Sequence, residues 1–316
     1  MIVDTVTRVV VESPYQDNIK LFNNPDTSDM NFMVPGMETP LKLHCKIMST
    51  TSNFVKYMMT QQEGGTNTQG RGWNYDMSKE ADRNALTKVM RFCYGERMEI
   101  GAENGECCAV IAELYRLQVT CAEEAVKKIG FFALEVSKRN LGIGMKLLRE
   151  SSLYPECCTE LGCGLDKALS QIVFSPYNIY RNYDIVVGGC LMKLPSRYLE
   201  MVGYGEPHTK FSEFNIRMEY VKQNMCTLSN EEKESVMKGC DWKELKGEEL
   251  KRLRQLDVMK DKELLDAYQE VLDKTEKELD ELKLTGVKTK TDRPNEESEL
   301  KSNSHITDNF YHVCFF

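Results

Sequence analysis

The amino-acid sequence predicts an α+β protein, in which a small sheet near the N-terminus is covered by helices and is followed by an all-α region. Residues 30–34 and 41–43 alternate apolar with polar side chains, and Pro35 and Gly36 lie between the two runs. An alternation with a period of two, interrupted by a proline–glycine turn, is typical of a β-hairpin. Beyond residue 136, apolar residues recur at helical spacing and strand signals largely disappear, which indicates helices.

The elements of the first half follow from the same periodicities. An apolar run over residues 6–11 predicts one strand before the hairpin. After the hairpin, Ser52 is a candidate N-cap for a short helix over residues 53–59, because its hydroxyl can accept a hydrogen bond from a backbone amide of the first turn. Apolar stripes at helical spacing predict three further helices, over residues 81–93, 107–114 and 121–136.

The second half is predicted to be helical. Helices are expected over residues 142–148, 165–174, 196–202 and 212–223. Ser229 and Glu232 have the spacing of a capping box, and residues 262–284 form a long charged segment with a narrow apolar stripe. Two alternatives remain for that segment: a solvated helix with one edge packed on the domain, or a short coiled coil.

Composition excludes several classes of partner. The chain has 316 residues, a net charge of −8 and no basic run, whereas a protein that binds mainly nucleic acid needs clustered Lys and Arg to displace counterions from phosphates. The same acidity argues against an anionic membrane surface. No apolar stretch approaches the roughly 20 residues that span a bilayer, and the N-terminus lacks the apolar core of a signal peptide. We therefore expect a cytoplasmic protein, with the nucleus as a further location.

The sequence lacks the catalytic and metal-binding patterns that we sought. It has no G-x-x-x-x-G-K-[ST] phosphate loop, no H-E-x-x-H motif and no G-x-S-x-G motif. Its twelve cysteines include two adjacent pairs, Cys107–Cys108 and Cys157–Cys158, rather than the C-x2-C spacing that aims two thiolates at one zinc ion. Because several cysteines fall on apolar helix stripes, we expect thiols that fill the core, with a metal or redox role as the alternative. We expect no enzyme activity, no cofactor and no metal.

Residues 44–59 resemble the hallmark of the BTB/POZ domain, in which a histidine ends the second strand and an S-x-aromatic-apolar-x-x-M helix follows. The matching positions are His44, Ile47, Met48, Ser52, Phe54, Val55 and Met58. Residues 28–36 are similar to that family's first strand, residues 86–95 to its helix ending in F-x-Y-G, and residues 109–119 to a later helix. These segments occur in the family's order along the chain.

The second half resembles the helical BACK region that often follows a BTB/POZ domain. The matching positions are Asn140, Leu141, Gly142, Leu194, Pro195, Leu199, Ser212, Glu213, Ile216, Tyr220 and Val221. At position 220 the family usually has tryptophan. The resemblance, together with composition, implies an N-terminal extension (1–19), a BTB/POZ domain (20–126), a BACK-like helical domain (127–240), C-terminal charged helices (241–284) and a disordered tail (285–316).

The resemblance implies a protein–protein interaction module. BTB/POZ domains commonly form homodimers, and many BTB-BACK proteins are adaptors that recruit a protein substrate to a cullin-RING ubiquitin ligase. In that subfamily a hydrophobic-x-Glu pattern after the helix binds the cullin. The matching positions are Gln61, Gln62 and Glu63, and Gln61 departs from the pattern. A non-catalytic oligomerising scaffold without a ligase role, and an enzyme in the helical half, are the alternatives.

The expected partner-binding residues lie on one short helix and just after it: Phe54, Tyr57, Met58, Met59, Gln61 and Glu63. Methionine-rich helices suit adaptable interfaces. For Val55 and Met58 a core position is the alternative, in which case Tyr57 and Met59 would carry the contact. His44 is expected to be structural, with its ring satisfied by the backbone rather than by a ligand.

Overall fold

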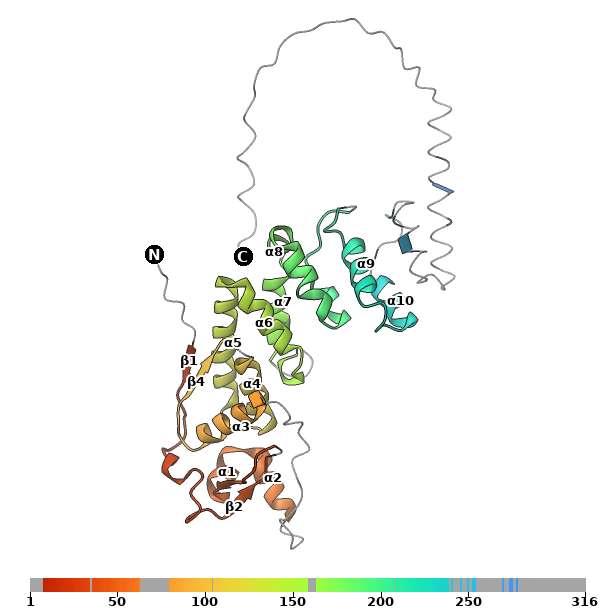
Figure 1. Ribbon diagram of the computed structural model, residues 1–316. Helices are drawn as coiled ribbons and strands as arrows, with labels where there is room; N and C mark the ends of the chain where they lie inside the picture. The colour runs from red at the N-terminus through yellow and green to blue at the C-terminus, as the bar shows by residue number, and fades with distance from the viewer. Residues whose placement is uncertain are drawn as a thin grey trace, which may run out of the picture.

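The computed structural model describes residues 8–34, 36–62, 80–103, 105–158, 163–207 and 209–238, and a few positions beyond them. Over this part of the chain the protein is mostly helical, with two small antiparallel sheets of two strands each (Figure 1). The predicted α+β class is thus confirmed, with helices dominant. Glu63, the expected disordered tail at 285–316 and nearly all of residues 241–284 lie outside the described residues.

The first sheet joins two strands that are far apart in the sequence. β1 (Arg8–Val11) pairs antiparallel with β4 (Met98–Gly101), with Val11 opposite Met98. The two strands lie side by side in Figure 1, and β1 also packs against α5 (Ala122–Arg139). The predicted N-terminal strand is confirmed where the structure describes it, whereas no strand is predicted at β4.

The second sheet is the predicted hairpin. β2 (Met30–Phe32) pairs antiparallel with β3 (Leu41–Leu43), with Met30 opposite Leu43. Between the strands Gly36 has a φ of +83°, a backbone conformation that glycine adopts without the steric cost of a side chain. The hairpin therefore follows from turn chemistry and from the alternation of apolar residues.

Helices α1 to α3 follow the hairpin in succession, and β4 separates α3 from α4. α1 (Cys45–Thr51) follows β3 directly, and α2 (Asn53–Gln62) begins where the sequence predicts a helix and extends beyond it. α3 (Glu80–Cys93) and α4 (Glu106–Arg116) pack against each other. α1 is not predicted, and it begins at His44 without a side-chain cap, so the local sequence carries no start signal for it.

The second half consists of helices and short helical turns. These are α5, α6 (Leu141–Ser151), η2 (Pro155–Cys157), α7 (Leu165–Val173), α8 (Pro176–Arg181), the π-helical turn η3 (Asp184–Gly188), η4 (Leu191–Lys193), η5 (Ser196–Met201), α9 (Glu213–Gln223) and α10 (Asn230–Lys238). Most of the predicted helices are confirmed, although the one expected over residues 196–202 is the 3-10 helix η5. No helix in the described ranges is long and apolar enough to cross a bilayer.

Side-chain caps begin two of these helices, and the sequence predicts the second of them. Ser212 Oγ accepts a hydrogen bond from the Asn215 amide at 3.3 Å, at the start of α9. The Ser229–Glu232 capping box is reciprocal: the Glu232 amide donates to Ser229 Oγ at 3.2 Å, and the Ser229 amide donates to the Glu232 carboxylate at 2.8 Å. Both contacts are local, so they could be read from residue spacing alone.

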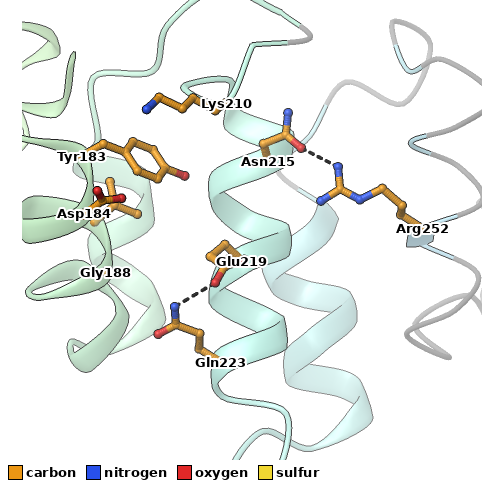
Figure 2. Close-up of a pocket in the computed structure, with 9 residues that line it drawn as sticks. Tyr183, Asp184, Gly188, Lys210, Asn215, Glu219, Gln223 and Arg252 are labelled. Carbon is orange, nitrogen blue, oxygen red and sulfur yellow. Dashed lines mark hydrogen bonds between the residues drawn. The ribbon is translucent and has the colours of Figure 1, made fainter.

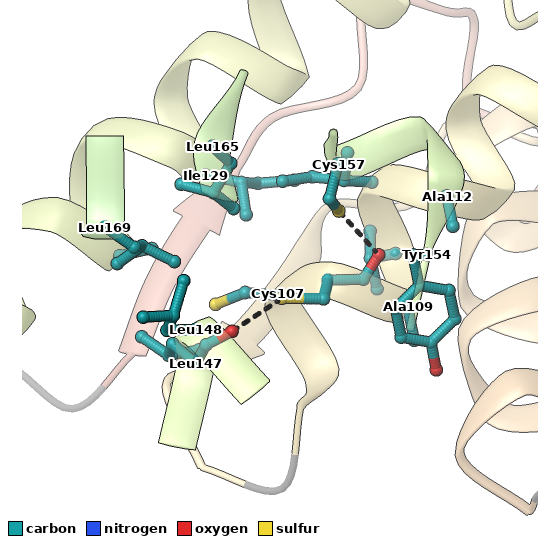
Figure 3. Close-up of a cluster of buried hydrophobic side chains, with 14 of the residues drawn as sticks. Cys107, Ala109, Ala112, Ile129, Leu147, Leu148, Tyr154, Cys157, Leu165 and Leu169 are labelled. Carbon is teal, nitrogen blue, oxygen red and sulfur yellow. Dashed lines mark hydrogen bonds between the residues drawn. The ribbon is translucent and has the colours of Figure 1, made fainter. Parts of the chain in front are cut away.

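One continuous hydrophobic core runs through both halves of the chain. Figure 3 shows part of it, to which α4 to α7 contribute Cys107, Ile129, Leu147, Leu148, Leu165 and Leu169. Because α5 continues across positions 126 and 127, the expected boundary between the two domains falls inside a single helix. The division into domains stays a prediction.

Several cysteines fill this core, as predicted. Those buried among apolar side chains are Cys93, Cys107, Cys108, Cys157, Cys190 and Cys240. Cys107 is a representative case: its thiol donates to the carbonyl oxygen of Gly101 at 3.2 Å, and burial raises its pKa to about 12. A thiol that stays protonated is a poor nucleophile and a poor metal ligand. Cys163 and Cys226, by contrast, are exposed.

Candidate functional site

Helix α2, which carries most of the expected partner-binding residues, is held at its start by Ser52. The Ser52 hydroxyl accepts a hydrogen bond from the Val55 amide at 3.1 Å and donates to the Leu117 carbonyl at 2.5 Å. Ser52 is completely buried and also forms a β-bridge with Val119. The predicted N-cap is therefore confirmed, and it also ties α2 to the segment that follows α4.

His44 lies between two hydroxyl groups rather than at an open surface site. Its Nδ1 is 3.2 Å from the Tyr94 hydroxyl, and its Nε2 is 3.0 Å from Thr27 Oγ1. The His44 amide also donates to the Tyr94 hydroxyl, at 2.7 Å. The structural role predicted for His44 is confirmed. The prediction that backbone groups satisfy its ring is wrong, because both ring nitrogens contact side-chain hydroxyl groups. Burial raises the pKa of Tyr94 to about 12, so this hydroxyl stays protonated.

The side chains of α2 divide between the core and solvent. Val55 is a core residue, which confirms one of the two alternatives for it. Tyr57 is 60% exposed, while Phe54, Met58 and Met59 are half-buried. Phe54 and Met59 pack against the core, so Met59 shares its surface between core and solvent. Tyr57 is thus the large apolar residue that α2 presents most openly. Gln61 lies in the last turn of α2.

A cleft of about 540 Å³ lies between η3 and α9, in a region for which the sequence predicts no site. Figure 2 shows the residues that line it: Tyr183, Asp184, Val187, Gly188, Lys210, Asn215, Glu219, Gln223 and Arg252. The Tyr183 side chain points from its own segment into the space before α9. A π-helical turn such as η3 is uncommon and often lies at a functional site. The lining residues come from separate segments, so no local pattern could have identified them.

Several polar groups that line this cleft contact one another. Lys210 Nζ lies 5.1 Å from the centre of the Tyr183 ring, and Arg252 donates a hydrogen bond to Asn215 Oδ1 at 2.9 Å. Burial, followed by the nearby charges of Glu219 and Asp184, raises the pKa of Tyr183. A phenol that holds its proton more tightly is a poor general base.

No group of three or more His, Cys, Asp or Glu side chains in the described ranges is placed to hold a metal ion. The adjacent cysteine pairs illustrate why. Cys107 and Cys108 donate to different carbonyl groups, those of Gly101 and Leu147. Their sulfur atoms therefore serve different contacts instead of converging on one centre.

Comparison with known proteins assigns no family to the chain. No family model matches it, no curated protein matches it and no solved structure matches it. The resemblance to BTB/POZ and BACK sequences therefore rests on the motifs and on the order of the elements.

Proposed function

We propose that the chain is a non-catalytic protein–protein interaction module, with a BTB/POZ-like domain followed by a BACK-like helical domain. It forms a homodimer through the first domain and recruits a protein substrate to a cullin-RING ubiquitin ligase. An adaptor of this kind performs no chemistry itself. It raises the effective concentration of the substrate near the ligase by binding both.

The order of the elements, and the residues that connect them, support this proposal. His44 follows the last strand of the β-hairpin, a capped helix starts after Ser52, and Tyr94 and Gly95 follow the end of α3, in the order of the BTB/POZ motifs. Gly95 has a φ of +96°, and a Cβ there would lie 2.5 Å from the Gln16 carbonyl oxygen. Glycine is therefore required at the end of that motif.

The exposed Tyr57 on the anchored helix α2 is the observation that carries the proposal. Tyr57 is 60% exposed and lies beside the half-buried Met58. Tyrosine and methionine are enriched at protein interfaces, because they offer large apolar contact areas on adaptable or amphipathic side chains. The hydrogen bonds of Ser52 hold the start of this helix in place, so a partner would meet a preorganised surface.

Light scattering on the full chain tests the homodimer. We expect a dimer for the wild-type protein and a monomer when Tyr57→Glu and Met58→Glu are combined, because two buried charges would be costly in an apolar interface. Tyr177→Glu is the matched control, because Tyr177 is 63% exposed on α8 and lies outside the proposed interface. A wild-type monomer at high concentration would contradict the proposal.

Binding of a purified cullin N-terminal domain tests the adaptor role. We expect binding at micromolar protein, and tighter binding for Gln61→Leu, which restores the apolar residue of the cullin-binding pattern. The control is Lys56→Leu, an apolar substitution at an exposed position of the same helix. If neither the wild type nor Gln61→Leu binds, the chain is an oligomerising scaffold without a ligase role.

A further inference from the structure

A second cleft, of about 380 Å³, lies where the end of α6 meets η4. Its lining residues are Lys146, Arg149, Glu150, Ser152, Leu153, Lys193 and Leu194. None of them belongs to α2 or to the cleft of Figure 2. This surface is therefore distinct from both of the sites described above.

The charge of this cleft has the opposite sign to that of the whole chain. Three cationic residues line it against one carboxylate, in a protein with a net charge of −8. Arg149 and Lys193 are both exposed, and within the described residues neither forms an ion pair. Both positive charges are close enough to affect the Cys190 thiol. Burial raises the pKa of this thiol to about 11, and the charges of Arg149 and Lys193 oppose that rise. Two cations from two elements thus converge on one side of the fold.

The same cleft also offers an apolar contact. Leu153, just beyond α6, is 55% exposed, while Leu194, just beyond η4, is buried. The Ser152 hydroxyl donates to the Arg149 carbonyl at 2.7 Å, so it is already engaged. A cation in the last turn of a helix is common for dipole reasons. That does not account for a second cation from η4, or for a leucine left exposed in the same cleft.

We propose that this cleft binds an acidic peptide segment of a partner protein, with its carboxylates paired to Arg149 and Lys193 and an apolar side chain packed on Leu153. The positive charges of Arg149 and Lys193 favour an anionic ligand. The exposed Leu153 favours a peptide over a polyphosphate, because a polyphosphate has no apolar group to pack on it. None of the residues that line the cleft is aromatic, so the cleft offers no ring on which a nucleic-acid base could stack.

Fluorescence anisotropy on the full-length protein, with a fluorescein-labelled peptide of repeated Glu-Glu-Leu, tests this binding. We expect saturable binding that weakens about tenfold when Arg149→Glu and Lys193→Glu are combined, since each change turns an attractive charge pair into a repulsive one. Two further peptides separate the contributions. Gln-Gln-Leu lacks the charge, Glu-Glu-Ser lacks the apolar side chain, and both should bind more weakly.

The matched control combines Lys127→Glu and Lys128→Glu on the exposed face of α5. It makes the same change in net charge and should leave the affinity unaltered. Equal losses in the two double variants would mean that only net charge matters, and would overturn the proposal. The absence of saturable binding would also overturn it, as would tighter binding of single-stranded RNA than of the Glu-Glu-Leu peptide.

Photo-cross-linking covers the case in which a charge-reversed variant fails to fold. A benzophenone group on the Glu-Glu-Leu peptide should label the wild-type protein within residues 146–153 or 191–194, and labelling only elsewhere would refute the assignment. The variant with Tyr57→Glu and Met58→Glu should bind the peptide as the wild type does. A loss of peptide binding is therefore distinguishable from a loss of dimerisation.

Discussion

Arg116 donates a hydrogen bond of 2.8 Å to Oε1 of Glu113, one turn away on α4, and the other carboxylate oxygen of Glu113 has no hydrogen-bond partner. Glu113 is only 1% exposed. The same guanidinium donates to Glu156 at 2.8 Å, which links α4 to η2. Burial outweighs the attraction of Arg116, and Asp82 and Glu156 add negative charge, so the pKa of Glu113 rises from 4.5 to about 7.

This carboxyl group should make stability depend on pH near neutrality. Because its pKa is raised in the folded state, the folded protein holds a proton that the unfolded chain releases, and stability is lost as the pH rises from about 4.5 through about 7. Glu113→Gln mimics the protonated form. It should therefore remove the decrease in unfolding free energy with rising pH, which is on the order of 3 kcal/mol. Urea unfolding from pH 5 to pH 8 measures the difference. Glu123→Gln, at an exposed position of α5, should keep the wild-type slope.

Removing one hydroxyl should weaken the contact between the turn after α6 and α3. Tyr154 donates a hydrogen bond of 2.6 Å to Asp82, and both residues are buried. Tyr154→Phe leaves the carboxylate without this donor, which should cost about 1–3 kcal/mol of unfolding free energy. Chemical denaturation checks the value. Tyr177→Phe removes a hydroxyl at a site that is 63% exposed and should change stability little. An equal effect of the two variants would show that the buried contact contributes nothing specific.

The buried Arg217 should be the main polar anchor of the last described helices. Its side chain is 2% exposed and donates to Glu213 at 2.8 Å, to Glu200 at 2.8 Å and to the Val236 carbonyl at 2.7 Å. These bonds join α9 to η5 and α10. Arg217→Met leaves the carbonyl group of Val236 unsatisfied and should cost roughly 3 kcal/mol. Thermal unfolding followed by circular dichroism measures it, with Arg181→Met on the exposed surface of α8 as control.

The hydroxyl of Ser52 should contribute to stability out of proportion to its size, because it accepts from one backbone group and donates to another. Ser52→Ala removes the cap of α2 and the bond to the Leu117 carbonyl. We expect a loss of about 1–3 kcal/mol, the sum of a helix cap and a buried hydrogen bond. Thr50→Ala, at an exposed position of α1, should cost much less. If the two substitutions have equal effects on the melting temperature, the buried hydrogen bonds of Ser52 contribute nothing specific to stability.

Local features of this protein were predictable from residue spacing. The hairpin around Gly36, the cap at Ser52 and the capping box of Ser229 and Glu232 each depend on residues within a few positions of one another. Helical stripes also placed the buried thiols such as Cys107 correctly. In each case the energetic preference is short-range, so the pattern along the chain carries the information.

Long-range features depended on tertiary structure. β4 pairs with a strand about 90 residues earlier, and neither strand is stable until the rest of the fold brings the two together. The ring partners of His44 are Tyr94 and Thr27, from two other segments. No periodicity in the sequence indicates either contact, because each joins segments that are far apart along the chain.

The same division applies to the sites. The sequence indicates that α2 carries an apolar, methionine-rich surface, and burial then separates the exposed Tyr57 from the core residue Val55. The convergence of Arg149 with Lys193, and the raised pKa of Glu113, arise only where separate helices meet. Helix and strand preferences act over a few residues, whereas burial and electrostatic fields act through space, and only the packed fold sets those distances.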